Sequence, residues 1–476
     1  MTKPRRIYLL SPKDLSPETI AVTFAKTSRS PKPFDEIAAE LTDERSAKFH
    51  EKWVVGYGHA SVAEHAVLHL ALENISRLAI ETIESNRLAS YTEKSTRYQQ
   101  WDEDAFFVPD ELKEHALKDA YVSLCSELFQ TYHNFIPQVQ SKMRQKYPQK
   151  EGESDKVYER RLKPDTVDVC RFLLPAASLA NVGVTINARA LEYAICKMLS
   201  SPLSEVREIG ARLRKVGEDE TPTLIKYAAC NDYLVGTRHQ MRQYASGLPS
   251  AQTPDDFQLL SWDEEGQDQV LAAILFRFGK SASFQDCINH IRNLPREEKI
   301  ELVESIMNPR GKFDQPLREF EYAQMTFEVV MDQGAYFEFK RHRMMTQTVQ
   351  PLSPELGFAV PKAITEAGCE KAYTAMMRKA ADFYEEVAKW NPDAASYIIP
   401  NGFNRRVLFT MNLRQAFHFC RLRAAHNAHF SIRRIAQRMA EEIVQVYPLL
   451  GQYLDRPEDE NWQMIEAAYF SSLSVR

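Results

Sequence analysis

The sequence predicts a mixed α/β (α+β) protein in which two units of similar plan follow each other, each a small sheet packed with long helices. A short apolar run at residues 7–11 precedes a helix pattern at residues 17–25 that begins at a proline. The same succession returns at residues 257–261 and 267–277, which is 250 positions later. Repeats of this kind set the fold of a chain.

A second constant spacing supports the duplication. Pro175 and Pro400 lie 225 positions apart, as do Asn187 and Asn412, and an arginine follows each asparagine after two residues. Two motifs that share one spacing indicate copies of one unit. The predicted domains are residues 1–230 and 257–476, and residues 231–256, which contain Gly, Pro and Ser, form the predicted linker.

Composition narrows the class of protein. The 476 residues exceed one ordinary core, and 44% apolar and 26% charged residues are typical of a soluble globular protein. A net charge of −5 argues against a nucleic-acid binder. Seven scattered cysteines without a C-x-x-C pair are typical of a reduced, cytoplasmic protein. No signal peptide and no apolar run of roughly 20 residues is present, so no membrane segment is expected.

Residues 59–98 are the most informative stretch. An apolar spacing that includes Val67, Leu70 and Ile75 predicts a helix, and a segment rich in hydroxyls and arginine follows it. Arginine binds phosphate through two parallel donors, so this segment is a candidate anion site, and a solvated basic loop is the alternative. On a helix, His65 and His69 would share one face as metal ligands do. The zinc motifs H-E-x-x-H and H-x-x-E-H are absent, which favours a structural His69 packed on the core over a metal site.

Three further features carry charge into apolar surroundings. Arg341, His342 and Arg343 follow an aromatic segment, at the place that Arg87 holds in the first half. Taken alone, this triplet is typical of an exposed basic turn. Arg171 and Arg423 also have apolar neighbours in sequence. Because a buried charge is costly unless it is paired, each arginine is expected to meet an anion or a carboxylate.

The remaining segments complete the plan. Residues 109–147 predict a long amphipathic helical region, and the charged residues 146–163 predict an exposed connection. A helix is predicted after each Asn-x-Arg triplet, ending near residues 199 and 423. Each half then closes with a charged helix, which begins near residue 203 in the first half and near residue 431 in the second.

The first half resembles the flavin-dependent thymidylate synthases, the ThyX family. That family carries His-x-Ser-x-x-Glu-His, and the sequence has it in full at residues 59–65. The second part of the family's Arg-His-Arg signature matches residues 89–98, and its Ala-Arg-x-x-Leu-Pro and Asn-x-Arg elements match residues 170–175 and 187–189. The likeness covers about the first 210 residues, and the second half follows the plan more loosely.

The two halves depart from the family pattern in complementary places. The first half has Ser85-Asn86-Arg87 in place of Arg-His-Arg, and Met198 in place of a helical arginine. The second half keeps Arg-His-Arg and Arg423, but has Pro351 and Ser353 at the signature serine and arginine, and Ser396 opposite Arg171.

The resemblance implies roles for individual residues. Those that would bind the flavin, FAD, are His59, Ser61, Glu64, Arg341, His342, Arg343, Asn412, Arg414 and His418. Those that would bind deoxyuridylate (dUMP) are Glu93, Ser95, Arg97, Arg171 and Arg423. The candidate catalytic residues are Arg343, His342 and Ser95, with Ser95 binding the base rather than attacking it.

By the same resemblance, the protein would be a methyltransferase that converts dUMP to dTMP. Methylenetetrahydrofolate and NADPH would be co-substrates, and the cofactors would carry the difficult chemistry. The family's active sites form between the subunits of a homotetramer, so a homodimer of tandem chains would imitate it. Two alternatives stay open: a diverged flavin- or nucleotide-binding protein without synthase activity, and, more distantly, a metal hydrolase that uses His65 and His69.

Overall fold

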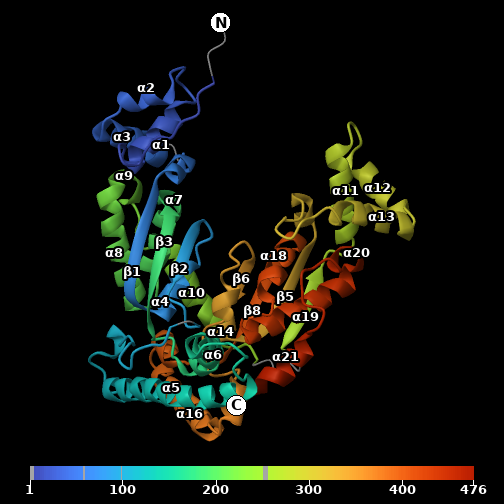
Figure 1. Ribbon diagram of the computed structural model, residues 1–476. Coiled ribbons are helices and arrows are strands. Elements are labelled where there is room, and N and C mark those ends of the chain that lie inside the picture. Colours follow the sequence, from blue (N-terminus) through green and yellow to red (C-terminus); the bar gives the residue numbers. More distant parts are fainter. Residues whose placement is uncertain (1–4, 57–58, 98, 250–255) are drawn as a thin grey trace. The chain divides into compact units, whose positions relative to one another are not determined.

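The computed structural model describes residues 5–56, 59–97, 99–249 and 256–476, which form two compact units. Unit 1 comprises Met1–Lys94, Phe106–Lys118 and Ala177–Ser250, and unit 2 comprises Ser95–Ala105, Asp119–Ala176 and Ala251–Arg476. Figure 1 colours the chain by position, so that the first-half helices α5 and α6 can be followed into unit 2. Each unit is therefore discontinuous, and unit 2 takes two segments from the first half of the sequence.

Unit 1 is built around a three-stranded antiparallel sheet with the strand order β1-β3-β2. Helices α7 and α8 pack against each other, and α1, α2 and α3 gather beyond one end of the sheet (Figure 1). Its elements are α1 Pro17–Lys26, α2 Phe34–Ala39, α3 Asp43–His50, η1 Glu51–Gly56, η2 Ala60–His65, β1 Val67–Ser76, α4 Arg77–Glu84, β2 Ala89–Glu93, η3 Asp110–Leu112, β3 Leu179–Asn187, α7 Ala188–Leu199, α8 Ser204–Glu220, α9 Pro222–Ile225 and α10 Asp232–Ala245.

Unit 2 has a four-stranded antiparallel sheet with the order β4-β5-β8-β6 and a two-stranded sheet β7-β9. Its first-half elements are α5 Lys118–Lys146, of which Lys118 itself lies in unit 1, α6 Asp155–Cys170 and η4 Arg171–Leu173. Its second-half elements are β4 Phe257–Trp262, α11 Gly266–Phe278, α12 Phe284–Asn293, α13 Arg296–Met307, η5 Arg318–Tyr322, β5 Gln324–Asp332, α14 Gln333–Phe339, β6 Thr346–Val349, β7 Phe358–Pro361, α15 Lys362–Glu366, α16 Glu370–Ala388, α17 Pro392–Ala395, η6 Ser396–Ile398, β8 Asn404–Asn412, α18 Leu413–Arg423, α19 Phe430–Val446, α20 Pro448–Gly451, α21 Trp462–Tyr469 and β9 Phe470–Val475.

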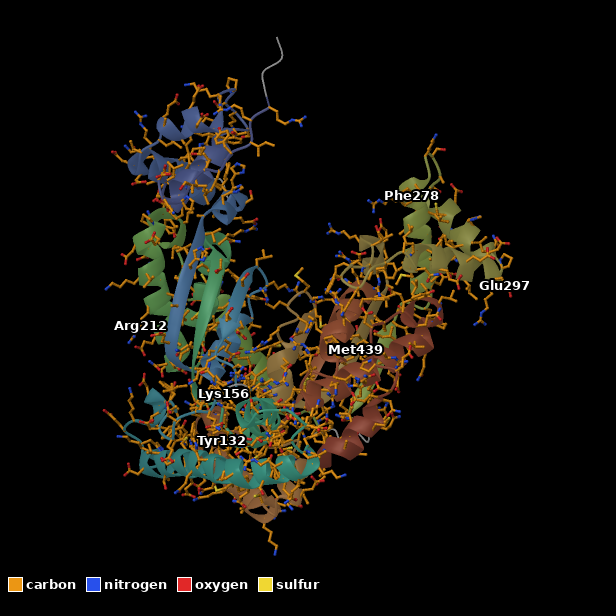
Figure 2. The ribbon with its side chains drawn as sticks, in the orientation of Figure 1. Tyr132, Lys156, Arg212, Phe278, Glu297 and Met439 are labelled. Atoms are coloured by element: carbon orange, nitrogen blue, oxygen red, sulfur yellow. The ribbon has the colours of Figure 1, made fainter. Side chains whose placement is uncertain are left out.

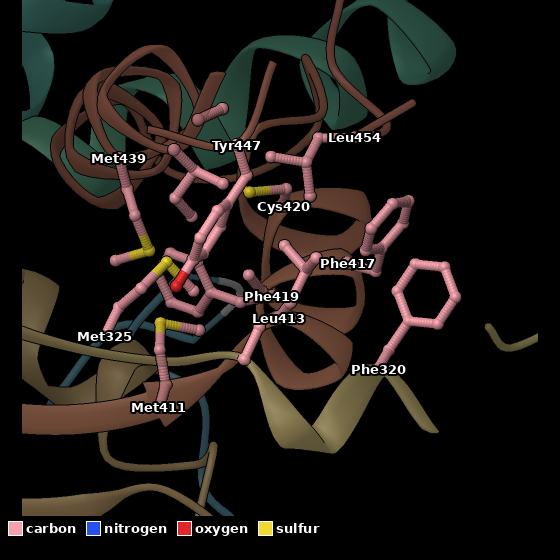
Figure 3. Close-up of a cluster of buried hydrophobic side chains, with 14 of the residues drawn as sticks. Phe320, Met325, Met411, Leu413, Phe417, Phe419, Cys420, Met439, Tyr447 and Leu454 are labelled. Atoms are coloured by element: carbon pink, nitrogen blue, oxygen red, sulfur yellow. The ribbon is translucent and has the colours of Figure 1, made fainter. Parts of the chain in front are cut away.

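The core of unit 2 lies where α18 and α19 cover the sheet. Met325 and Met411, which pair across β5 and β8, point toward Met439 and Tyr447 (Figure 3). All four side chains are buried. Close packing of this apolar layer fixes both helices on the sheet, and it thereby fixes the residues at the end of α18.

The register of the two sheets agrees with the duplication. Val67 pairs with Asn187 in unit 1, and Gln324 pairs with Asn412 in unit 2. Strand β1 contains a bulge that includes Asn74, whose φ of 56° is left-handed and is tolerated by asparagine. Because of this extra residue, β1 and β5 are 257 positions apart at their first residues and 256 positions apart at their last residues.

Equivalent side chains cap equivalent helices. Ser76 begins α4 and binds Glu205 on α8, with Ser76 Oγ 2.5 Å from Glu205 Oε2. Asp332 begins α14 and accepts a hydrogen bond from Ser431 Oγ on α19. In unit 1 the serine lies at the strand end and the carboxylate on the helix, and in unit 2 the two are exchanged. Both units therefore keep a hydrogen bond between the strand end and the helix.

Within unit 2, segments of the two halves meet at matching residues. Ala176 N donates to Ile399 O at 2.9 Å, and Asn401 N donates to Leu174 O at 3.0 Å. Ala176 and Asn401 are 225 positions apart, and so are Leu174 and Ile399, so the two bonds are equivalent. Between them, Pro175 forms a β-bridge with Pro400. The contact is reciprocal in the way that an isologous dimer interface is.

Several predicted elements are confirmed: the helices at residues 17–25 and 267–277, the strand at 257–261, the helices that follow both Asn-x-Arg triplets, and the closing helices α8 and α19. The helical region predicted at residues 109–147 is largely α5.

Other predictions were wrong. Residues 67–76 form strand β1 rather than a helix, and residues 7–11 form no strand. Residues 155–163, predicted as an exposed connection, belong to helix α6. The linker at residues 231–256 stays a prediction: it includes helix α10, and its residues 250–255 lie outside the described part of the chain, as does Tyr98 of the signature. Within the described residues, no helix is long and apolar enough to cross a membrane.

Candidate functional site

A cluster of three arginines and two carboxylates lies within unit 2. Arg97 and Arg171 come from the first half of the sequence, and Arg423 comes from the end of α18. Asp168 on α6 and Glu338 on α14 are the carboxylates. We call these five residues the arginine cluster.

Asp168 binds Arg97 along one edge of its guanidinium. Arg97 Nε donates to the two carboxylate oxygens at 3.1 and 3.0 Å, and Arg97 Nη2 lies 2.9 Å from Oδ2. Nη1 donates to the carbonyl of Asn427 at 3.3 Å. Burial raises the pKa of Asp168, while Arg171 and Arg97 oppose that shift. The pair fixes the guanidinium of Arg97 against the corner that follows α18.

Arg171 is the most deeply placed cation of the cluster. Its side chain is 3% exposed, and Nη1 donates to Thr96 Oγ1 at 3.1 Å. Nη2 lies 3.6 Å from Glu338 Oε1, too far for a hydrogen bond, and neither Nε nor Nη2 has a hydrogen-bond partner in the described structure. Two buried donors without acceptors carry a desolvation penalty that an anionic ligand would relieve.

Glu338 links Arg171 to Arg423. Its Oε2 accepts from Arg423 Nη1 at 2.9 Å, and Arg423 Nε donates to His342 Nε2 at 3.0 Å. His342 is therefore neutral, with its proton on Nδ1. Burial and the nearby Arg423, His418 and Arg341 lower its pKa well below the usual value. This chain of contacts connects an arginine of the first half to the Arg-His-Arg segment of the second.

The rest of the Arg-His-Arg segment lies in the turn after α14. Arg341 is exposed, and Arg343 is half-buried. His418 on α18 is near, with its ring 5.6 Å from that of His342. The interpretation of this triplet as an exposed basic turn therefore holds for Arg341, but the His342 side chain is buried.

Two predicted flavin ligands serve the fold. Asn412 caps α18 and exchanges hydrogen bonds with Gln415, at 2.9 Å in both directions. Arg414 donates to Pro316 O and Glu321 Oε1, both at 2.9 Å. These contacts give Asn412 and Arg414 structural roles.

The remaining predicted residues of unit 1 are bound locally. Glu64 accepts from Arg189 Nη1 at 2.5 Å, and Ser61 and His59 are exposed, with the His59 ring 6.1 Å from that of Trp53. The Glu93 carboxylate is buried and lies 2.8 Å from Arg77 Nη1. Ser95, in unit 2, accepts from the backbone N–H of Arg97 at 3.2 Å, which shapes the loop that presents Arg97.

The prediction that His69 packs on the core was wrong, and so was the helix that would pair it with His65. His69 is exposed on β1 and contacts Thr185 across the sheet, with Nδ1 3.0 Å from Oγ1. His65 precedes the strand in η2. Among the described residues, no group of three or more His, Cys, Asp or Glu side chains could hold a metal ion.

Asp168, Glu338 and Thr96 were missed from the sequence. Asp168 stands three residues before Arg171 and Glu338 three residues before Arg341. The arginines that they bind, Arg97 and Arg423, are distant in the sequence, so this local spacing does not identify the pairs.

The cluster borders a cavity of about 240 Å³ in unit 2. Arg97 and Asp168 form part of its wall, and Phe430 and Tyr469, stacked with ring centres 5.0 Å apart, form an aromatic side. Side chains of both charges line it. A cavity of this size and polarity suits a small polar ring that carries an anionic group.

Comparison with known proteins agrees with this architecture. The family model described as thymidylate synthase complementing protein matches residues 10–223 and again residues 258–449. The chain therefore belongs to the thymidylate synthase complementing protein family, with two tandem copies of its domain. The resemblance to flavin-dependent thymidylate synthases is confirmed.

Relatives of two kinds match the chain. A UPF0159 protein of Chlamydia muridarum is 30% identical over 433 residues, which cover 87% of this chain and 82% of that protein. A UPF0159 protein of Thermoplasma acidophilum is 28% identical over 450 residues, or 87% and 89%. A flavin-dependent thymidylate synthase of Clostridium tetani is 27% identical over 213 residues, which cover 42% of this chain and 82% of the enzyme.

Proposed function

We propose that this protein is a flavin-dependent thymidylate synthase that methylates dUMP, with a nucleotide site assembled from both halves of the chain. The observation that carries the proposal is the arginine cluster, in which Arg97 and Arg171 of one half meet Arg423 of the other. The three guanidinium groups converge on the carboxylates of Asp168 and Glu338. The name of the Clostridium tetani relative supports the same reaction.

The protein groups suit a nucleotide monophosphate. The guanidinium of Arg171 offers two buried donors without acceptors, which a phosphate or a uracil oxygen can accept. Arg423 is positioned by Glu338 and His342 on two of its nitrogens. Positive groups fixed in this way stabilise negative charge that develops on the pyrimidine without further reorganisation.

The flavin fits part of its predicted residue set. The Nδ1–H of His342 is a donor in the tautomer that Arg423 imposes, and the charged or polar groups of Arg341 and His418 lie near that imidazole. Such groups suit the diphosphate or a ring carbonyl of FAD. Asn412 and Arg414 fit less well because their polar atoms are used in the fold. The flavin would supply hydride transfer from NADPH to the methylene carbon delivered by tetrahydrofolate.

The first experiment is the absorbance spectrum of the purified protein with FAD and then dUMP added. A flavin spectrum that shifts when dUMP is added is expected if both ligands share a site. Tritium release from labelled dUMP then measures turnover. Arg97→Ala and Arg341→Ala should each abolish release, whereas Arg212→Ala, an exposed position on α8 (Figure 2), should not change it. Residual turnover in both the Arg97→Ala and the Arg341→Ala variant would contradict the composite site.

The alternative is a diverged nucleotide-binding protein without synthase activity. It is favoured by the internal pairing of the cluster, because Asp168 already accepts from Arg97 and Glu338 already accepts from Arg423. The structural use of Asn412 and Arg414 points the same way. Binding of dUMP without any retained FAD, even with FAD in excess, would support this alternative over the synthase.

A further inference from the structure

A buried imidazole, that of His429, lies next to the arginine cluster. It stands immediately before α19 and is 1% exposed. Its Nδ1 accepts a hydrogen bond from Ser431 N at 3.2 Å, and its Nε2 lies 3.2 Å from the main-chain oxygen of Asp168. Because a neutral imidazole that accepts at Nδ1 carries its proton on Nε2, the ring donates to Asp168 O. Burial, together with the nearby Arg171 and Arg97, lowers the pKa of His429 well below its usual value, which keeps the ring neutral.

The hydrogen bond from His429 fixes the residue that binds Arg97. The carboxylate of Asp168 accepts from Arg97 Nε at 3.1 and 3.0 Å. The main-chain oxygen of Asp168 belongs to the last turn of α6, where carbonyl groups have no partner within the helix. His429 therefore satisfies the end of α6 at the same residue whose side chain orients the guanidinium of Arg97.

The same imidazole supports the aromatic side of the cavity in unit 2. Its ring is stacked with that of Phe430, with ring centres 4.1 Å apart, and with that of Phe172, with ring centres 6.0 Å apart. Phe430 is stacked in turn with Tyr469, and both line the cavity. His429 thus contacts the polar wall of the cavity through Asp168 and the aromatic wall through Phe430.

The first half of the chain shows that the corner before such a helix does not need an imidazole. Leu203 stands immediately before α8, as His429 stands before α19, and the two positions are 226 residues apart. Leu203 is also buried, but its side chain has no polar atom that could bind a neighbouring backbone group. Both helices are nevertheless 17 residues long. The imidazole is therefore found in the copy of the corner that borders the arginine cluster, where it has a partner in Asp168.

We propose that His429 is a positioning residue of the nucleotide site: it holds Asp168, and through Asp168 the guanidinium of Arg97, in the orientation that binds the anionic group of the ligand. It also fixes Phe430 in the aromatic wall of the cavity. This inference rests on the proposed function, since it assigns His429 to the same site. Both ring nitrogens are needed for this role, so an apolar side chain cannot replace the imidazole, whereas a side chain with one donor and one acceptor can replace it in part.

The test is isothermal titration of dUMP into the full chain, with His429→Leu and His429→Gln compared with the wild type. Leucine is the residue at the equivalent position of unit 1, so His429→Leu should fold while it loses both hydrogen bonds. We expect this variant to bind dUMP more weakly by on the order of tenfold. Glutamine keeps one donor and one acceptor, so His429→Gln should recover most of the affinity. A side chain that only fills space would not show this difference.

The matched control is Tyr447→Phe. Tyr447 is another buried ring of unit 2, and its hydroxyl donates to Asp263 O at 3.0 Å. It is not among the described residues that line the cavity. Loss of this hydroxyl should lower the urea midpoint without changing the affinity for dUMP, which separates an effect on the site from an effect on stability.

A double-mutant cycle in urea tests the link between His429 and Asp168 without any ligand. Its variants are His429→Leu, Asp168→Asn and the two combined. If His429 orients Asp168, then Asp168→Asn should lower the urea midpoint less in the His429→Leu background than in the wild type. Independent residues would instead have additive effects.

The proposal is overturned if His429→Leu binds dUMP with the affinity of the wild type, or if His429→Gln binds as weakly as His429→Leu. Additive effects of His429→Leu and Asp168→Asn in urea overturn it as well. Absence of dUMP binding by the wild type would contradict the proposed function, and the urea cycle would then decide by itself whether His429 positions Asp168.

Discussion

Replacing Glu338 by glutamine removes the carboxylate that Arg171 and Arg423 share. Its oxygens lie 3.6 Å from Arg171 Nη2 and 2.9 Å from Arg423 Nη1. With an effective dielectric constant of about 20, these two attractions amount to roughly 5 and 6 kcal/mol before desolvation is subtracted. Because the neutral amide leaves two buried guanidinium groups without that partner, we expect a net loss of about 3–5 kcal/mol in the free energy of unfolding of unit 2.

An added anion should restore part of this loss. A ligand that binds only the folded state, present at about 100 times its dissociation constant, stabilises that state by about 2.7 kcal/mol. If the ligand binds next to the unpaired arginines, it will bind Glu338→Gln more tightly than the wild type, and the urea midpoint of the variant will rise more when dUMP is added. The matched control is Glu297→Gln on the exposed α13 (Figure 2).

The measurement is urea unfolding of wild type, Glu338→Gln and Glu297→Gln, each with and without dUMP. The reasoning is refuted if Glu338→Gln unfolds at the wild-type urea concentration. It is also refuted if dUMP shifts both proteins equally, since the carboxylate would then not compete with the ligand for Arg171 and Arg423.

Three further outcomes are expected. Burial raises the pKa of Asp332 above 3.8, so the folded state binds more protons at this carboxyl than the unfolded state does. The free energy of unfolding should therefore fall as the pH rises from 3.8 through the folded pKa. In a profile of the urea midpoint against pH, Asp332→Asn should flatten that part. Burial lowers the pKa of His429 well below 6.5, so its contribution is present above 6.5 and lost as the pH falls, and His429→Gln should reduce the loss of stability measured between pH 7 and 5. A Cβ at Gly402 would lie 2.5 Å from the Tyr373 hydroxyl, so Gly402→Ala should lower the free energy of unfolding by about 1–3 kcal/mol, whereas Gly236→Ala in the open α10 should raise it by up to about 1 kcal/mol in the same assay.

The elements predictable from the sequence were those with local signals. Asparagine caps at Asn187 and Asn412 begin α7 and α18, and the constant spacing between them located both helices. Strand β1 was mistaken for a helix because Val67 and Ala71 place apolar residues on its exposed face, and the bulge at Asn74 interrupts the period of two. The pattern that remained imitates a helix.

The partners of the site arginines depended on contacts between distant segments. Arg97 meets Asp168 across 71 positions, and Arg423 meets Glu338 across 85. No local pattern contains such information. What the sequence did indicate was the need for a partner, because arginines among apolar residues had to meet a carboxylate or an anion once buried.

The division of the cluster arginines between the halves has a geometric explanation. Arg171 corresponds to Ser396 and Arg423 corresponds to Met198, each pair 225 positions apart. Within unit 2, the segments around Pro175 and Pro400 meet reciprocally, so a duplicated chain offers two equivalent positions for these arginines. Because Ser396 and Met198 stand at the second of these positions, Arg171 and Arg423 come together at the first, where both face Glu338.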